Sequence, residues 1–176
     1  MSSAPPPDRR PLIVTAWIDP DDLRPFSRLR TRFFPAERNY LDAHLTLFHH
    51  IEPDDRQAFM DYARECLADV PAFTAEVLPP FALGGGVAYG VEAKGMRALR
   101  QPLRDAFRNR LTAQDARPWK RPHLTVQNKV DPATADRLLR HLTHHFTPCR
   151  LRIRGLSFYR YDGGPWHELG NLALRD

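Results

Sequence analysis

The sequence predicts an α+β fold in which two lobes of β-sheet, with helices outside, share one central cleft. A four-residue phrase occurs twice, as His44-Leu45-Thr46-Leu47 and, 79 positions later, as His123-Leu124-Thr125-Val126. Both copies lie in runs of strand-forming residues, and a helix-like segment follows each. The elements before a glycine turn are expected in the order strand, helix, strand and helix, and the same order recurs after the turn. We therefore expect each lobe to contribute one HxTx strand to the cleft.

The strands are predicted from short runs of apolar and β-branched residues, beginning with the apolar run LIVTAWI. The expected strands are 12–18, 44–51, 73–78, 81–92, 122–130, 151–161 and 166–174. Gly84-Gly85-Gly86 is read as a hairpin turn, because a phosphate-binding loop would continue with Lys-Ser or Lys-Thr and strand formers follow instead.

The helices are predicted from apolar residues at a period of 3.6. The expected helices are 21–34, 56–70, 96–111 and 132–146. Asp21 is expected to cap the first helix, which requires Pro25 to lie in its first turn. In the third helix an apolar stripe is expected in the core, and the opposite face is expected in solvent; that face carries Arg97, Arg100, Arg104 and Arg108.

Length and composition indicate one domain of 176 residues with 42% hydrophobic and 27% charged residues. Residues 1–10 lack the apolar region of a signal peptide and are expected to form a flexible tail before a single domain at 11–176. No apolar run is long enough to span a membrane. Two cysteines, Cys66 and Cys149, provide no disulfide framework and suit the cytoplasm. We expect a monomer.

Positive charge is concentrated between Lys94 and Arg160, where 16 Lys and Arg face four Asp, a balance of +12 in a chain of +5. Clustered cations attract phosphate backbones, so this stretch predicts an anionic partner such as RNA. The alternative is the coding bias of a GC-rich genome, since the chain has 23 Arg and three Lys.

Each HxTx strand is predicted to have a chemical face and a core face, because successive side chains of a strand point in opposite directions. His and Thr share one face. Phe48 and His50 are expected to extend it in the first copy, and Gln127 and Lys129 in the second. Two imidazoles, each beside a hydroxyl, suggest an acid/base pair with hydrogen-bond donors for an anion between them, as metal-free phosphodiester chemistry requires.

A third triplet, His141-Leu142-Thr143, lies in a predicted helix. There residues i and i+2 are about 200° apart, so this His and Thr cannot act together. The spacing of His141 and His145, together with the doublets His49-His50 and His144-His145, would allow a metal site, but no acidic ligand cluster lies near them and we expect no metal. No GxSxG elbow indicates a serine hydrolase.

The two HxTx motifs, the proline before the second one and the hairpin Gly163-Gly164-Pro165-Trp166 resemble the 2H phosphoesterase superfamily. More narrowly, residues 11 to 174 resemble bacterial proteins of the 2'-5' RNA ligase family. The resemblance implies a pseudo-twofold α+β fold, with mainly antiparallel sheet, whose paired motifs lie at its centre. It also implies cyclic phosphodiesterase, 2'-5' ligase or phosphodiesterase, or RNA exonuclease activity.

For the site, the resemblance implies His44 as proton donor and His123 as proton acceptor, although the residues alone do not assign the two roles. Thr46 and Thr125 are expected to hold the non-bridging phosphate oxygens. Further substrate contacts are expected from Lys120, Arg121, Lys129 and, by base stacking, Tyr40. The expected substrate is RNA or a nucleotide with a 2',3'-cyclic or 2'-5' phosphodiester, and no cofactor is expected. The alternative is a non-catalytic module that binds an RNA terminus or phosphate.

Overall fold

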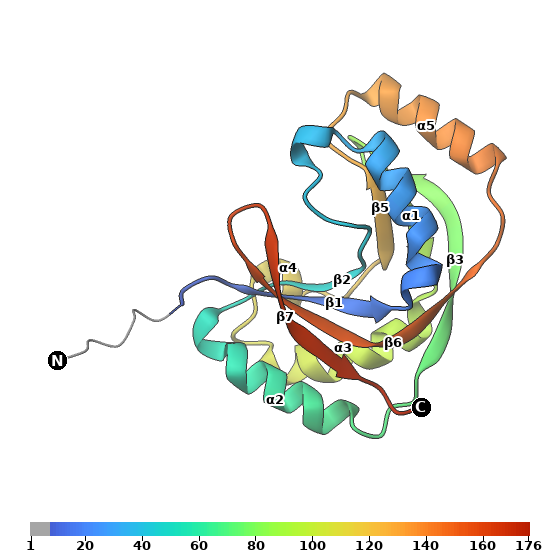
Figure 1. Cartoon of the computed structure of the whole chain (residues 1–176). Helices are drawn as coiled ribbons and strands as arrows, with labels where there is room; N and C mark the ends of the chain where they lie inside the picture. Colours follow the sequence, from blue (N-terminus) through green and yellow to red (C-terminus); the bar gives the residue numbers. More distant parts are fainter. Residues whose placement is uncertain (1–7) are drawn as a thin grey trace.

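Seven strands form one antiparallel sheet in the computed structural model, which describes residues 8–176 (Figure 1). The path of the sheet is β2-β1-β6-β3-β4-β5, and β7 pairs with β6. The strands are β1 Leu12–Ile18, β2 Thr46–Ile51, β3 Phe73–Ala82, β4 Val87–Val91, β5 His123–Gln127, β6 Arg150–Tyr161 and β7 Trp166–Ala173. The α+β class with a mainly antiparallel sheet is thereby confirmed.

The helices lie outside this sheet, as Figure 1 shows. They are α1 Pro20–Phe33, α2 Arg56–Leu67, α3 Ala93–Phe107, α4 Ala113–Ala116 and α5 Pro132–His144, with short 3-10 turns at Ala36–Arg38 and Pro53–Asp55. Helices α2 and α3 pack together, whereas α1 packs against β5 and α5 against β3 and β4. None of the helices within residues 8–176 is long and apolar enough to cross a membrane.

The order of elements had suggested that each half of the chain forms one half of the sheet. The structure differs from this prediction. Strands β1 and β2 lie with β6 and β7 from the end of the chain, and β3, β4 and β5 form the other half. The long strands β3 and β6 pair through Phe73–Glu76 and Arg150–Ile153 and join the halves. The last hairpin, formed by β6 and β7, therefore completes the lobe that begins with β1.

Two of the boundaries that differ from the prediction, the start of α1 and the end of β3, have local reasons. Helix α1 begins at Pro20 and is capped by Asp19, whose carboxylate accepts from the backbone N–H of Asp21 at 3.0 Å. Proline suits this first position, and Pro25 lies beyond the first turn, contrary to our expectation. Strand β3 continues through Pro79-Pro80 to Ala82, because a register shift between Val77 and Pro80 accommodates the two prolines.

The turn at Gly84–Gly86 is confirmed as a hairpin between β3 and β4. Gly84 has φ +83°, and a Cβ at Gly86 would lie 1.9 Å from the carbonyl oxygen of Gln127. Both positions therefore require glycine, one for its backbone angle and one for the close approach of β5.

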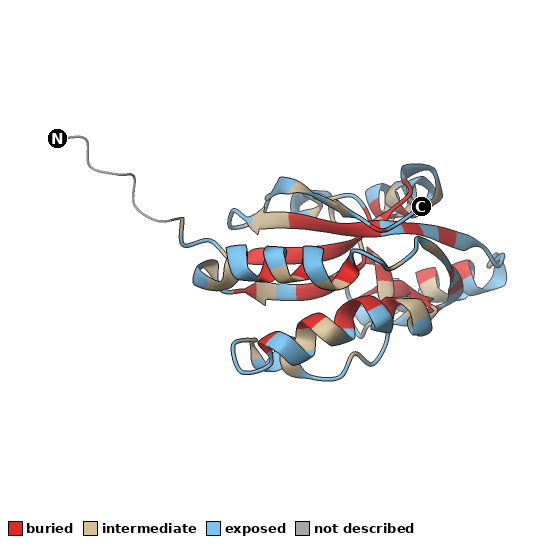
Figure 2. Cartoon of the chain, turned by 90° about the horizontal axis from the view of Figure 1, so that it is seen from below, coloured by how far each residue is buried: buried red, intermediate tan, exposed pale blue. Residues whose placement is uncertain are grey.

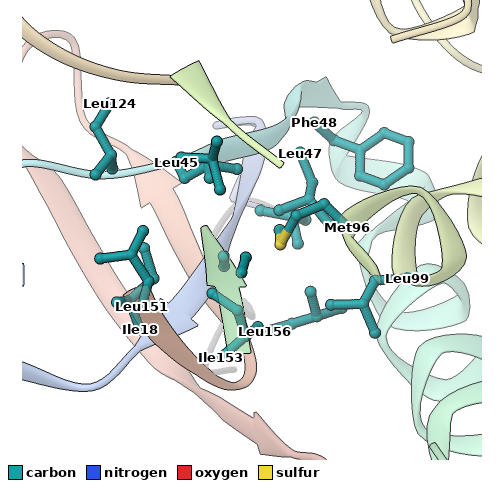
Figure 3. Packing of buried hydrophobic residues seen from close by; sticks show 14 of the residues in the cluster. Ile18, Leu45, Leu47, Phe48, Met96, Leu99, Leu124, Leu151, Ile153 and Leu156 are labelled. Atoms are coloured by element: carbon teal, nitrogen blue, oxygen red, sulfur yellow. The ribbon is translucent and has the colours of Figure 1, made fainter. Parts of the chain in front are cut away.

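The core faces of both motifs enter one hydrophobic core, as predicted. Figure 2 shows the buried positions on the faces where helices and sheet meet. Leu45, Leu47, Leu124 and Val126 are at most 1% exposed and belong to a single cluster with residues of α3 (Figure 3). Burial of each such side chain contributes about 1.5–3 kcal/mol. The two motifs are thus anchored from behind by the same core.

Residues 1–7 of the predicted tail lie outside the described residues. Within residues 8–10, Asp8 forms ion pairs with Arg10, Arg56 and Arg160, and Arg10 pairs with Asp162.

Candidate active site

Both HxTx motifs line one cavity, although β2 and β5 lie at opposite ends of the sheet path. The cavity has a volume of about 190 Å³ and is lined by His44, Thr46, His49, Trp119, His123, Thr125 and Trp166. Curvature of the sheet brings its two ends together. Two imidazoles and two hydroxyls from distant strands therefore meet in one space.

The two motif histidines are held in the same way. Nδ1 of His44 lies 2.8 Å from the carbonyl oxygen of Asp42, and Nδ1 of His123 lies 2.9 Å from the carbonyl oxygen of Arg121. A carbonyl oxygen only accepts, so Nδ1 of each ring carries the hydrogen. In each neutral ring Nε2 is then the acceptor, and both histidines carry their lone pair on the same nitrogen.

An aromatic ring lies beside each of these histidines. The Trp166 ring, from the end of the predicted glycine hairpin, lies 4.7 Å from the His44 ring. The Phe81 ring lies 5.8 Å from the His123 ring, edge to face, and the Arg121 guanidinium lies 4.3 Å above Phe81. These contacts restrict the rotation of both imidazoles and place one of the predicted cations next to His123.

The environment of His44 favours its neutral form. Burial lowers the pKa of the His44 imidazole from 6.5 to about 4. The hydrogen bond to the Asp42 carbonyl opposes this shift, and three neighbouring groups add to it: Arg30, His49 and His123. The His44 imidazole is therefore neutral at neutral pH.

A β-bulge in β2 changes which residues face the cavity. Thr46 pairs with Thr15 of β1 and Phe48 with Val14, so one residue of β1 faces two of β2. Phe48 is consequently buried, and the prediction that Phe48 and His50 extend the chemical face is wrong. His49 takes that place instead.

The second motif contains the same bulge. Thr125 pairs with Ala88 of β4 and Gln127 with Val87, so Val126 and Gln127 are both buried. Gln127 lines a different cavity of about 340 Å³ with Arg32, Arg137 and His141. Lys129 follows the strand at φ +63° and packs beside Gly85 in the glycine turn. The prediction that Gln127 and Lys129 extend the chemical face is also wrong.

The other residues predicted to contact substrate differ in whether they line a cavity. Tyr40 is 60% exposed and lines a neighbouring cavity of about 410 Å³ that shares His44 and Trp166 with the first. Lys120 is exposed, and neither it nor Lys129 is among the described residues that line the two cavities. Of the predicted substrate contacts, Tyr40 thus shares a cavity with His44, and Arg121 lies beside His123 through its carbonyl oxygen and the Phe81 ring.

Two buried arginines connect each motif to the loop before the other. Arg30 of α1 donates to the carbonyl oxygens of Leu41 at 3.0 Å and Thr125 at 3.1 Å. Arg100 of α3 donates to the carbonyl oxygen of Leu47 at 2.8 Å. It also donates to two carbonyl oxygens before the second motif, those of Asp115 at 2.6 Å and Arg117 at 3.3 Å.

Only 4% of Arg100 is exposed, so our prediction that it lies on a solvated face is wrong. Burial lowers the pKa of both guanidinium groups, that of Arg30 to about 10. Both nevertheless stay charged at neutral pH. In the sequence, Arg30 and Arg100 have the same spacing as the exposed arginines around them, so the pattern did not indicate that they bond to the backbone of the motifs.

We expect Arg100→Met to lower the free energy of unfolding by about 3 kcal/mol, because each buried acceptor that loses its partner costs about 1–3 kcal/mol. For a chain of this length that is a drop in Tm of roughly 6–12 °C, measurable by calorimetry. Arg97→Met is the matched control, since Arg97 is exposed on the same helix. Equal Tm values for the two variants would contradict this role of Arg100.

The remaining histidines lie elsewhere. His141 is on α5, as predicted for the third triplet, and its ring lies 4.5 Å from that of His145. All three of His141, His144 and His145 are exposed. Within residues 8–176 no group of three or more His, Cys, Asp or Glu side chains is arranged to hold a metal ion.

The basic stretch between Lys94 and Arg160 contains many arginines that form ion pairs in the fold. Several of its arginines pair with acids from elsewhere in the chain: Arg110 with Asp55, Arg150 with Glu76, Arg152 with Asp19 and Asp22, Arg154 with Asp19, and Arg160 with Asp8 and Asp162. The local excess of positive charge is therefore partly neutralised in the fold.

Residues 18–165 match the protein family described as the 2'-5' RNA ligase superfamily. The chain belongs to this superfamily. Its fold is shared by a solved structure described as a phosphoesterase, with TM-score 0.69, 18% identity and coverage of 96% of this chain and 100% of that one.

Two further structures share the superfamily fold. Escherichia coli LigT complexed with 3'-AMP has TM-score 0.68, 18% identity and coverage of 96% and 100% of the two chains. The protein TT0787 of Thermus thermophilus has TM-score 0.67, 16% identity and coverage of 94% and 98%. The search of curated proteins gave no match.

Proposed function

We propose that this protein is a metal-independent phosphodiesterase that hydrolyses RNA-type 2',3'-cyclic phosphates or 2'-5' linkages. The proposal is supported above all by the two equivalent His-Thr pairs, each with Nδ1 fixed to a carbonyl oxygen, that line one cavity. Membership of the 2'-5' RNA ligase superfamily agrees with it. LigT, which shares the fold, has been crystallised with 3'-AMP and with phosphate, which supports a nucleotide substrate for this chain as well.

In the proposed hydrolysis of a 2',3'-cyclic phosphate, Nε2 of His44 removes a proton from the attacking water. A new P–O bond forms, one P–O bond to the ribose breaks, and His123 donates a proton to the departing ribose oxygen. The hydroxyls of Thr46 and Thr125 donate to the non-bridging oxygens as negative charge develops there. The same groups with exchanged roles would catalyse 2'-5' ligation in reverse.

This assignment of acid and base is opposite to the one that the family resemblance implies. It follows from the pKa of His44, because a group with a pKa of about 4 is almost entirely neutral at pH 7, so the lone pair of Nε2 is available to take a proton from the attacking water. We further propose that the enzyme acts as a monomer in the bacterial cytoplasm without a cofactor.

The test is a turnover assay with three substrate classes: 2',3'-cyclic mononucleotides, RNA oligomers that end in a cyclic phosphate, and 2'-5' linked oligomers. We expect hydrolysis of at least one class, with an unchanged rate in excess EDTA, since the proposed steps use only protein groups. His44→Ala, purified in parallel, controls for contaminating nucleases. Binding without turnover would favour the phosphate-binding module, and loss in EDTA that zinc, magnesium or manganese restores would contradict the mechanism.

The pH dependence of kcat/KM distinguishes the two assignments of His44. As a base, His44 must be neutral, so we expect kcat/KM to fall as the pH decreases through about 4, and to fall again on the alkaline side because the proton donor must be protonated. If His44 were the proton donor in the free enzyme, kcat/KM would instead fall as the pH increases through that value. Rates measured from pH 3.5 to 9 in buffers of constant ionic strength separate these outcomes.

A further inference from the structure

A third imidazole in the cavity is held by a buried carboxylate. Nδ1 of His49 lies 3.0 Å from Oδ1 of Asp115, whose side chain is only 1% exposed. The same carboxylate accepts from the backbone N–H groups of His49 at 2.9 Å and of His50 at 2.9 Å. The ring and the backbone around it are therefore both fixed by Asp115.

The Asp115 carboxyl is ionised in this setting. Burial raises its pKa, but hydrogen bonds from the His49 ring and from the backbone of His49 and His50 outweigh burial and lower the pKa below its usual value. An ionised carboxylate only accepts, so Nδ1 of His49 carries a hydrogen and Nε2 is the remaining ring nitrogen. A carboxylate partner also stabilises the positive charge of an imidazolium.

The ring of His49 is available to a ligand. Its side chain is 48% exposed and lines the same cavity as His44 and His123. The two bulges place Asn128 at the position of the second half that corresponds to His49. The Oδ1 atom of Asn128 accepts from the backbone N–H of Lys129 at 2.8 Å, and Asn128 is not among the residues that line the cavity. His49 therefore breaks the pseudo-symmetry of the site, and the paired proton transfers do not require it.

We propose that His49, held by Asp115, is a third histidine of the active site that binds an anionic phosphate oxygen through Nε2. This inference rests on the proposed function in one respect, that the cavity receives a phosphate group. Its role is affinity, because the pair of motif histidines already balances the proton removed and the proton delivered. The form of His49 that binds the anion is the one that carries a hydrogen on Nε2 as well as on Nδ1, and the Asp115 carboxylate faces its charge. Substrates with the most negative phosphate groups gain most from this contact.

The experiment measures the binding of inorganic phosphate to the full chain by isothermal titration calorimetry. We expect His49→Ala to weaken binding about 10- to 100-fold, the factor that corresponds to the loss of one hydrogen bond between charged groups. KM for a hydrolysed substrate should increase by a similar factor, and kcat should change by less than about threefold. His50→Ala is the matched control, because the neighbouring ring bonds to Glu52 at 3.1 Å and does not line the cavity.

His49→Asn, which introduces the residue found at the corresponding position after β5, provides a second neutral variant in case alanine disturbs the fold. Unchanged phosphate affinity in a folded His49 variant would overturn the inference, and so would a large fall in kcat with unchanged KM. The experiments distinguish a failure of the proposed hydrolytic function from a failure of the inference about His49. If the wild type hydrolyses no phosphodiester but the His49 variants still lose phosphate affinity, the proposed function is wrong and the inference that His49 binds phosphate is supported.

Discussion

Replacement of either His44 or His123 by alanine is expected to lower kcat by roughly 10²- to 10⁴-fold, the usual contribution of a positioned acid or base. Each imidazole is fixed by one carbonyl oxygen at Nδ1, and no other motif residue offers a proton at the same place. The double variant should be no slower than the slower single variant, because the two groups act as one unit. Single-turnover rates on the substrate found in the assay measure this directly.

The chain provides its own control for this experiment. His141 belongs to the same local triplet, but it is exposed on α5 and lies outside the cavity. His141→Ala should therefore retain the wild-type rate. An inactive but folded His141→Ala, together with an active His44→Ala, would move the site to the C-terminal histidines.

Thr46→Ala and Thr125→Ala are each expected to lower kcat about 10²- to 10³-fold, the cost of removing one preorganised donor to a developing oxyanion. Both side chains are partly exposed in the cavity, so the change in Tm should be small. Substrate affinity should change less than kcat, because the hydroxyls are proposed to stabilise charge that appears in the transition state.

Steady-state kinetics and thermal melts of the two threonine variants provide the measurement. Thr143→Ala, in the exposed helical triplet, is the matched control. A threonine variant with normal kcat would show that its hydroxyl does not contact the reacting phosphate.

The sequence was sufficient to predict which residues of the motifs meet, because a period of two places His and Thr on one face and buries Leu45 and Leu124 on the other. It was not sufficient beyond the fourth residue of either motif. A bulge after Thr46 adds one residue, and a second register shift follows before Ile51, so Phe48 and His49 exchanged their expected places. The adjacent apolar pair Leu47-Phe48 was the available sign of this break.

Other parts of the site depend on contacts between distant segments. Asp115 lies in α4 and Trp119 in the loop that follows it, a segment in which the sequence had indicated only the cations as functional residues. Arg30 and Arg100 share the spacing of surface arginines, and only the packing of α1 and α3 shows that they are buried. A period of 3.6 defines a face, but it does not say what covers that face.

The crossed bonds of Arg30 and Arg100 also determine when, during folding, a functional cavity exists. Each guanidinium bonds to one motif and to the segment that leads to the other, so these bonds form only when both halves are in place. An intermediate with one lobe assembled has no half-active site. We therefore expect the cavity to be complete only when both lobes have docked.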